Sequence, residues 1–319
     1  MRNKYVSFLL IIFVALIVTI GTTSAKSSNS STPSKQMVQL LTDMKAYSKL
    51  RSTNFIMLGN GASSLMAKYP QLFNSLDGLM VESMFYGGNM KEDVLTSTAD
   101  TNYHKKLLKL PLQRKFPIFN LDYCHSTEKI RDAYQKANSL GIVESVSSRW
   151  ELDIPYRMKL NEKPRVCRNL KAVKSFLVML NPGRYGSVKK YIDALAATRQ
   201  DMLIIDLYFG GTPLTKQQVK RLKTRADGKR RLVLAYMSVG EAETYRPYWK
   251  REWNNKPPAW LSKVNKDWGS YRVKYWNPQW KSILYGSSGS YLDMIMAASF
   301  DGVFLDTIDS YSFFENSGN

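Results

Sequence analysis

The chain has 319 residues, of which 44% are hydrophobic, and its formal net charge is +20 at neutral pH. This length allows one large domain or two small ones, and the hydrophobic share excludes a globally disordered chain. The basic residues are scattered and no stacking aromatics are interleaved with them. This pattern is typical of a solvated basic surface and disfavours nucleic acid as a partner.

Residues 1–25 are predicted to be a secretory signal peptide. Arg2 and Lys4 give the positive end, residues 6–20 the apolar stretch, and residues 23–25 a small-residue cleavage site. The alternative is an uncleaved anchor, although the stretch is short for a membrane span. We therefore expect a secreted, periplasmic or cell-surface protein without a stable span after cleavage. Subtracting the two signal charges from +20 leaves +18. Residues 26–36 are predicted to be a polar tether.

Residues 37–319 are predicted to form a single domain in which apolar runs alternate with amphipathic segments. Ser126 and Gly141 bound one such segment, and Thr215 with Gln218 gives a capping box. This alternation favours the α/β class and a (β/α)8 TIM barrel. The alternative, an open doubly wound sheet, lacks its glycine fingerprint. The eight runs expected as strands are 55–58, 78–85, 117–123, 142–146, 176–181, 202–208, 231–239 and 302–306.

Polar residues stand where most of these strands end. In a barrel these ends share one rim, which is the catalytic face. Packed carboxylates raise the pKa of at least one of their number, so an acid and a base arise from one residue type. The alternative for any one of them is a helix cap. The residues are Asn60, Glu82, Asp122, Glu144, Asn181, Asp206, Glu241, Glu243, Asp306 and Asp309.

The longest connection, residues 240–300, is rich in Trp and Tyr. Aromatic faces beside acids suit a sugar, and the alternative is a structural lid whose rings pack on the barrel rim. Two histidines and no Cys/His cluster argue against a zinc site, and no cofactor motif is present. Cys124 and Cys167 either pair in a disulfide or are separately buried.

Four motifs resemble glycoside hydrolase family 114 in order and spacing. They are AYMSVGEAETYRPYW (235–249), PAWL (258–261), WGSYRVKYWNPQW (268–280) and FDGVFLDTIDSY (300–311). Residues 176–209 resemble the first two strands of that family, so the resemblance covers roughly residues 171–311. It implies a barrel with glycosidase activity and no metal or cofactor.

The second half of the family barrel resembles segments that lie earlier in this chain. These segments carry Asn60-Gly61, Glu82, Phe85-Tyr86 and Asp122-Tyr123 in the family's order. The chain therefore resembles a circular permutation of the family barrel. Residues 37–150 would be the second half, 151–174 a linker and 175–311 the first half. A cut in a surface loop leaves the core pairing unchanged.

The resemblance implies an exported endo-α-1,4-polygalactosaminidase-like enzyme. Asp306 and Glu243 are the expected central catalytic pair, while Asp206 and Glu241 hold hydroxyls or tune pKa values. The motif of fungal members resembles residues 302–309 of this chain but has a Glu where this chain has Phe304. Because of the charge of +18, the expected polysaccharide is acetylated or anionic. The alternative is an inactive carbohydrate-binding or envelope protein on the same barrel. The expected substrate-binding residues are Asn60, Glu82, Asp122, Tyr123, Asp309, Tyr236, Trp276 and Tyr245.

Overall fold

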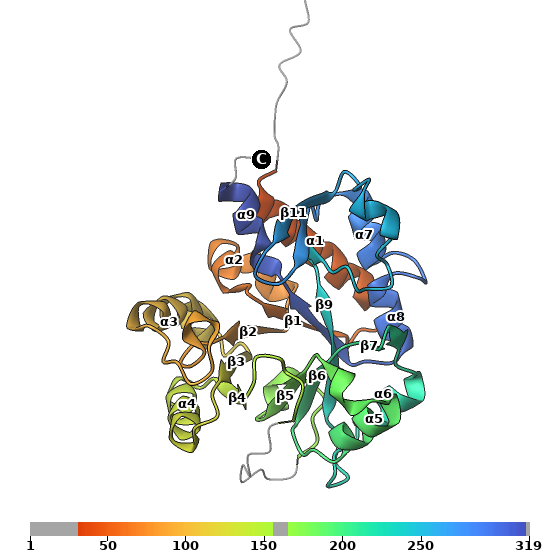
Figure 1. Ribbon diagram of the computed structural model, residues 1–319. Helices are drawn as coiled ribbons and strands as arrows, with labels where there is room; N and C mark the ends of the chain where they lie inside the picture. The colour runs from red at the N-terminus through yellow and green to blue at the C-terminus, as the bar shows by residue number, and fades with distance from the viewer. Residues whose placement is uncertain (1–30, 156–164, 317–319) are drawn as a thin grey trace, which may run out of the picture. The chain divides into compact units, whose positions relative to one another are not determined.

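A computed structural model describes residues 31–155 and 165–316, and its main feature is an eight-stranded parallel sheet rolled into a nearly closed barrel (Figure 1). Each apolar run of the sequence forms one of its strands, so the predicted (β/α)8 fold class is confirmed. The strands are β1 (Ile56–Asn60), β2 (Gly78–Glu82), β3 (Ile118–Tyr123), β4 (Val143–Ser147), β5 (Phe176–Met179), β6 (Met202–Ile205), β9 (Leu232–Ser238) and β13 (Gly302–Asp306).

The ring closes between the first and the last strand of the chain. β1 lies parallel to β13, with register from Ile56 opposite Gly302 to Gly59 opposite Leu305, as the sequence predicted. The sheet has no backbone ladder between β4 and β5. A side-chain hydrogen bond crosses this seam instead, because Ser145 Oγ donates to the carbonyl of Phe176 over 2.8 Å.

Helix α1 covers the wall between β13 and β1. Lys45 Nζ donates to the carbonyl of Phe55 over 3.1 Å, just before β1, and Tyr47 OH donates to Asp293 of α8 over 2.8 Å. α1 begins at Pro33, so the predicted tether ends before residue 36. The helices are α1 (Pro33–Lys49), α2 (Ser63–Lys68), α3 (Thr98–Gln113), α4 (Thr127–Leu140), α5 (Val188–Ala196), α6 (Lys216–Leu222), α7 (Pro278–Leu284), α8 (Tyr291–Ala297) and α9 (Tyr311–Asn316).

Two hydrophobic layers form because successive strand residues point to opposite faces. The inner layer fills the barrel and includes Leu58, Phe119, Ile204 and Phe304, whereas the outer layer packs the helices on the strands. The same alternation decides which strand-end polar groups face the lumen. A residue one position away from a lumen-facing neighbour points outward, whatever its chemistry.

The long connection after β9 is ordered by its own elements. There a small antiparallel sheet joins β10 (Glu241–Ala242), β12 (Ser270–Val273) and β11 (Leu261–Asn265). The earlier connection, between β6 and β9, contains a second antiparallel pair, β7 (Tyr208–Phe209) with β8 (Thr212–Pro213). Trp260, Trp280 and Tyr275 of the long connection are almost completely buried. These three rings pack inside the protein, as expected if the long connection is a structural lid.

Cys124 and Cys167 are both buried and free, so they form no disulfide with each other. No helix in the described ranges has the length and apolar character needed to cross a membrane. The predicted signal peptide lies outside the residues that the structure describes.

Candidate active site

Asn60 joins two carboxylates at the C-terminal ends of neighbouring strands. Its Nδ2 donates to Glu82 Oε1 over 2.6 Å and to Asp306 Oδ1 over 2.9 Å. The far oxygens are held by phenols: Tyr123 OH donates to Glu82 Oε2 over 2.7 Å, and Tyr236 OH to Asp306 Oδ2 over 3.1 Å. Five side chains from β1, β2, β3, β9 and β13 thus form one network at the barrel rim.

The environment of this network favours the protonated forms of its acids. Burial, followed by the negative charge of Asp306, raises the pKa of Glu82 to about 7, although its hydrogen bonds from Tyr123 and Asn60 oppose the shift. Burial also raises the pKa of Asp306. Near neutral pH Glu82 is therefore divided between its acid and carboxylate forms, as a proton donor that later acts as a base requires.

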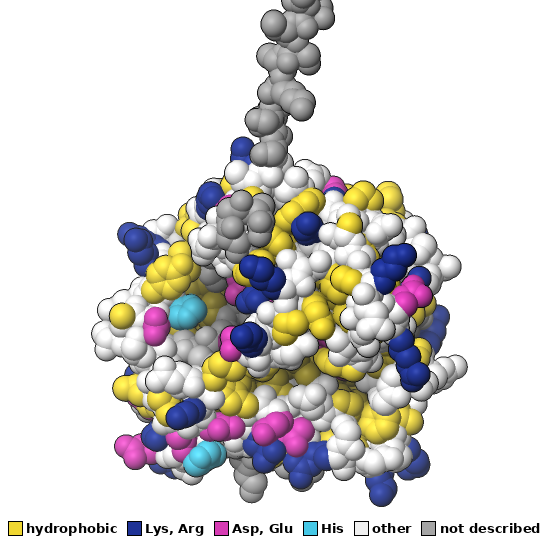
Figure 2. Space-filling model, turned by 45° about the horizontal axis from the view of Figure 1, so that its top comes forward, with side chains coloured by type: hydrophobic (Ala, Val, Ile, Leu, Met, Phe, Trp, Pro, Cys, Tyr) yellow, Lys and Arg dark blue, Asp and Glu magenta, His cyan; other side chains and the backbone are white. Residues whose placement is uncertain are grey.

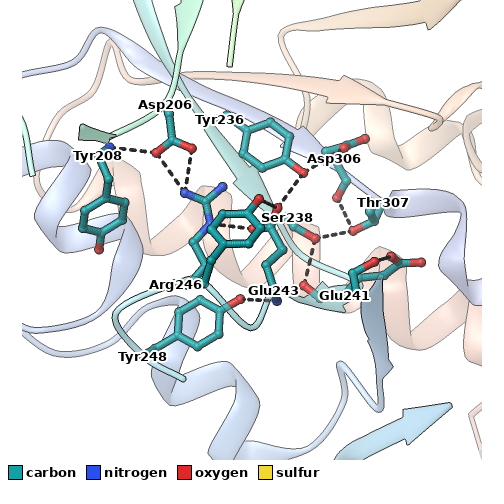
Figure 3. Close-up of polar contacts among 12 residues, drawn as sticks. Asp206, Tyr208, Tyr236, Ser238, Glu241, Glu243, Arg246, Tyr248, Asp306 and Thr307 are labelled. Atoms are coloured by element: carbon teal, nitrogen blue, oxygen red, sulfur yellow. Dashed lines mark hydrogen bonds and ion pairs between the residues drawn. The ribbon is translucent and has the colours of Figure 1, made fainter. Parts of the chain in front are cut away.

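A second group of acids is neutralised by Arg246. Its Nη1 contacts both oxygens of Asp206, at 2.8 and 2.6 Å, and its Nε contacts Glu243 Oε2 at 2.6 Å. Figure 3 shows Arg246 lying between these two carboxylates. Tyr245 OH also donates to Glu243, and the backbone N–H of Tyr208 donates to Asp206 over 2.7 Å. Burial raises the pKa of Asp206, although the positive charge of Arg246 opposes the shift.

Solvent access separates the two groups. Asp206 and Glu243 are buried, with 7% and 8% of their surface exposed, whereas Glu82 and Asp306 are partly exposed. Tyr236 connects the groups, because its hydroxyl lies 3.1 Å from Asp306 and 3.5 Å from Glu243. Glu82 and Asp306 can therefore touch a ligand. The buried Arg246 group, which consists of Arg246, Asp206 and Glu243, supports them without touching the ligand.

Unusual backbone follows both exposed acids. Ser83 and Thr307, which come directly after Glu82 and Asp306, have positive φ angles of 53° and 59°. Thr307 Oγ1 accepts a hydrogen bond from the N–H of Gly240 over 2.8 Å, and a Cβ on Gly240 would lie 2.3 Å from the carbonyl of Thr307. Such conformations persist where the surrounding structure fixes them, and they cluster at functional sites.

The prediction for Asp122 is wrong in its placement. Tyr123 faces the lumen, so Asp122 points to the outer face of the barrel, where it accepts a hydrogen bond from the N–H of Phe85 over 3.1 Å. Asn120 on the same outer face donates to Glu144 over 2.8 Å. Burial raises the pKa of Asp122 to about 6. Asp122 therefore lies behind the barrel wall and cannot bind a substrate at the rim.

Glu241 also departs from its expected place. Its carboxylate accepts hydrogen bonds from Asn265 Nδ2, at 3.0 Å, and from Ser270 Oγ, on either side of the β11–β12 turn. In Figure 3 it lies on the far side of Ser238 from Arg246. Glu241 thus fixes the hairpin and does not join the Arg246 group.

Two further expected ligand residues have different surroundings. Trp276 packs edge-on against Phe314 of α9, with ring centroids 5.0 Å apart, and not within the acid network. Asp309 is exposed at the mouth, directly beside Gly61, where an added Cβ would lie 3.2 Å from its Cγ. Only Asp309 of these two lies next to the Asn60 segment.

Two cavities of about 430 and 260 Å³ are lined by residues that do not belong to the acid network. They occupy the barrel wall between α3 and α4, and their shared lining residues are Lys105 and Leu140. No carboxylate of the described chain lines either cavity. The chemistry of the rim therefore belongs to the open mouth of the barrel and not to these wall cavities.

Sequence reasoning missed Arg246 and Trp150. Arg246 follows Glu243 by three residues, so the signal available was an Arg beside two glutamates in a Tyr-rich loop. Trp150 follows β4, and its ring lies 3.6 Å from that of Tyr123. Its position depends on the fold of the exit segment, which leaves no sequence pattern.

A (β/α)8 barrel with a carboxylate network at the strand ends is a common architecture for enzymes that cleave glycosidic bonds. Residues 175–319 match the model of the glycoside-hydrolase family GH114, which covers a little under half of the chain. The resemblance seen in the sequence is thereby confirmed for β5 to α9. The match supports glycoside hydrolase activity.

Three uncharacterized proteins are similar to part of the chain. One from Methanocaldococcus jannaschii is 38% identical over 131 residues, which cover 40% of this chain and 36% of the relative. One from Deinococcus radiodurans is 35% identical, covering 41% and 40%, and one from Thermotoga maritima is 34% identical, covering 37% and 35%. Each match spans well under half of the relative.

Proposed function

We propose that the chain is an exported glycoside hydrolase that cleaves an amino-sugar polysaccharide of the galactosamine type. The observation that carries this proposal is the bridge from Asn60 to Glu82 and Asp306. It presents two carboxyl groups of raised pKa at the open mouth of a barrel whose residues 175–319 match a glycosidase family. Paired carboxyl groups are what glycoside hydrolysis requires.

Glu82 and Asp306 fit the two roles better than the pair expected from the sequence, Asp306 and Glu243. Glu243 is buried and ion-paired with Arg246, whereas Glu82 and Asp306 are partly exposed. The side-chain hydrogen bonds to Glu82 and Asp306 come from neutral amide and phenol groups. Moving the Glu243 side chain onto a substrate would break its buried ion pair with Arg246, at a large electrostatic cost. Glu243 and Asp206 instead keep Arg246 in place, and Tyr236 links them to Asp306.

In the proposed reaction, Glu82 donates its proton to the glycosidic oxygen as the bond from that oxygen to the anomeric carbon breaks. An oxygen of Asp306 bonds to the anomeric carbon and gives a covalent glycosyl ester. The Glu82 carboxylate then takes a proton from water, whose oxygen displaces Asp306 from the sugar. Glu82 ends protonated and Asp306 ionised, so both return to their starting states.

The charge of the protein bears on the state of the amino sugar. Figure 2 shows Lys and Arg side chains spread singly over one face of the molecule. With a net charge of +18 after signal removal, the surface repels a fully deacetylated, cationic polymer. An N-acetylated or anionic glycan is therefore the proposed substrate, and export is proposed from the predicted signal peptide.

A hydrolysis screen with the secreted protein tests this proposal. New reducing ends would be measured on N-acetylated and deacetylated α-1,4-linked galactosamine polymers and on unrelated glycans. Activity should be lost in Asp306→Asn and retained in Asp193→Asn, a matched change on the exposed face of α5. Binding of a glycan without hydrolysis of any would contradict the enzyme assignment and favour a carbohydrate-binding protein.

A further inference from the structure

An aromatic wall leads from the acid network to the molecular surface. Tyr123, whose hydroxyl contacts Glu82, packs its ring on Trp150 at a centroid distance of 3.6 Å. Trp150 in turn contacts Trp268, with centroids 6.5 Å apart and planes at 82°. Tyr123 is 2% exposed and Trp268 is 65% exposed. The three rings therefore run from the buried floor of the site to open solvent.

The outer ring of this wall comes from the other side of the barrel. Trp268 lies in the turn between β11 and β12, which follow β9, whereas Trp150 follows β4. β6 and β5 separate β9 from β4 in the ring of strands. The hairpin tip thus reaches across to the exit of β4.

Hydrogen bonds and an ion pair hold the segments that carry the two outer rings, Trp150 and Trp268. Glu241 accepts hydrogen bonds from Asn265 and Ser270, which flank the turn that carries Trp268. The backbone N–H of Trp150 donates to the Glu92 carboxylate over 2.9 Å. The preceding residue, Arg149, forms an ion pair with Asp153 over 2.9 Å. An exposed aromatic side chain held in one place loses little conformational entropy when a ligand packs on it.

We propose that Trp150 and Trp268 form a sugar-binding subsite that receives the polysaccharide chain next to the bond held at Glu82 and Asp306. The inference rests on the proposed function, because it takes the ligand to be the same glycan. The C–H faces of pyranose rings pack on aromatic faces, and the polar edges remain hydrated. The indole N–H of Trp150 is buried and has no acceptor among the described residues.

This arrangement gives Glu241 a role different from the catalytic one expected from the sequence. Glu241 contacts no atom of the Asn60 network in the described residues, yet it holds the hairpin turn that presents Trp268. It is a positioning residue for the subsite. Replacing Glu241 by Gln keeps the shape of the side chain and one hydrogen-bond acceptor, but it weakens the hydrogen bonding to the turn.

The test compares short and long ligands. In the Asp306→Asn background, which removes turnover, calorimetric titration with an N-acetylated α-1,4-galactosaminan disaccharide and hexasaccharide measures binding directly. Trp268→Ala should weaken hexasaccharide binding by about two- to tenfold and leave the disaccharide unchanged. Trp268→Phe, which keeps an aromatic ring, should lose less of its affinity for the hexasaccharide. Tyr103→Ala, which removes an exposed ring from α3, should change neither affinity.

Hydrolysis by the otherwise unaltered enzyme separates this inference from the proposed function. The same Trp268→Ala change should raise KM for the long chain by the same factor and leave kcat within about twofold. Equal binding of the hexasaccharide by both proteins overturns the subsite, as does the absence of any binding. Binding that depends on Trp268 without hydrolysis by the wild type supports the subsite and overturns the enzyme assignment.

Discussion

Asn60 Nδ2 lies 2.9 Å from Asp306 Oδ1 although 246 residues separate the two in the chain. The contact exists because β1 and β13 are paired in register, so their C-terminal ends reach the same point of the rim. The same amide nitrogen holds Glu82. One side chain thus sets the spacing of the two carboxyl groups that the proposed reaction uses.

Glu82→Gln and Asp306→Asn should each lower kcat/KM by about 10²–10⁴-fold or more, because each removes a group that moves a proton or forms a bond. Neither change should lower the melting temperature, since each removes a charge from a site where acids lie close together. Steady-state kinetics and thermal unfolding check this. A steep fall in melting temperature with unchanged activity per folded molecule would instead mark a structural role.

Hydrolysis should retain the anomeric configuration. The bridged oxygens of Glu82 and Asp306 are at most about 5.5 Å apart, because one nitrogen lies 2.6 Å from the first and 2.9 Å from the second. This upper bound is compatible with the roughly 5–5.5 Å between the carboxyl groups of retaining enzymes and lies below the 6.5–9.5 Å of inverting enzymes. Proton NMR of the first-formed product identifies its anomer. An inverted product would exclude Asp306 as the nucleophile.

Arg246→Met should destabilise the fold by about 3–5 kcal/mol, because it leaves Asp206 and Glu243 buried without a counter-charge. Urea unfolding measures the change. The matched control is Lys189→Met, which breaks an exposed pair with Asp193 on α5 and should leave stability unchanged. A variant as stable as the wild type would show that the fold does not need Arg246 as the counter-charge of these two acids.

Stability and activity should both report the raised pKa of Glu82. A folded-state pKa of about 7, above the ordinary value of 4.5, means that the folded chain holds the proton more tightly. This contribution is complete below pH 4.5 and is lost as the pH rises to about 7. Glu82→Gln should therefore gain stability relative to the wild type across that window, by at most about 3–4 kcal/mol, which is about 2.5 pKa units at about 1.36 kcal/mol each. Denaturant unfolding between pH 4 and pH 8 measures it, and parallel curves would contradict the shift.

Much of the fold could be predicted from the sequence because it depends on local patterns. Apolar runs of strand length, separated by capped helices, specify eight parallel strands without any knowledge of distant contacts. Parallel strands then place their C-terminal residues on one rim, so the meeting of Asp206, Glu243 and Asp306 could also be expected. These inferences use the chain direction and the period of the pattern only.

The side-chain environments could not be predicted in the same way. Asp122 and Tyr123 are neighbours, and which of them faces the lumen depends on the phase of β3 within the barrel. Glu241 and Glu243 look alike in the sequence, but the β11–β12 hairpin places Asn265 and Ser270 within hydrogen-bond distance of Glu241. Arg246 becomes a counter-charge only when the loop after β9 folds back over β6. Each outcome depends on contacts between distant segments.

The order of the elements supports a last proposal, that the barrel is a circular permutation of the family barrel. α1 comes first in the chain but lies between the last strand, β13, and the first, β1, where the family would place a helix after β13. The start of α1 lies beside α9 (Figure 1), and the N–H of Ser34 donates to Glu315 over 3.3 Å. The seam without a backbone ladder, between β4 and β5, lies where the family barrel would have its two ends.

Restoring the family order should therefore preserve the barrel. The variant would begin at residue 170, run through residue 319, continue by a short Gly/Ser linker into Thr32, and end at residue 155. We expect wild-type activity and cooperative unfolding, because the join connects segments that already touch and the new ends open the seam between β4 and β5, which has no backbone ladder. The control, with the same linker but new ends between Leu203 and Ile204 inside β6, should fail to fold, since it cuts a strand paired on both sides. If the family-order variant also failed to fold, the proposed permutation would lose its structural support.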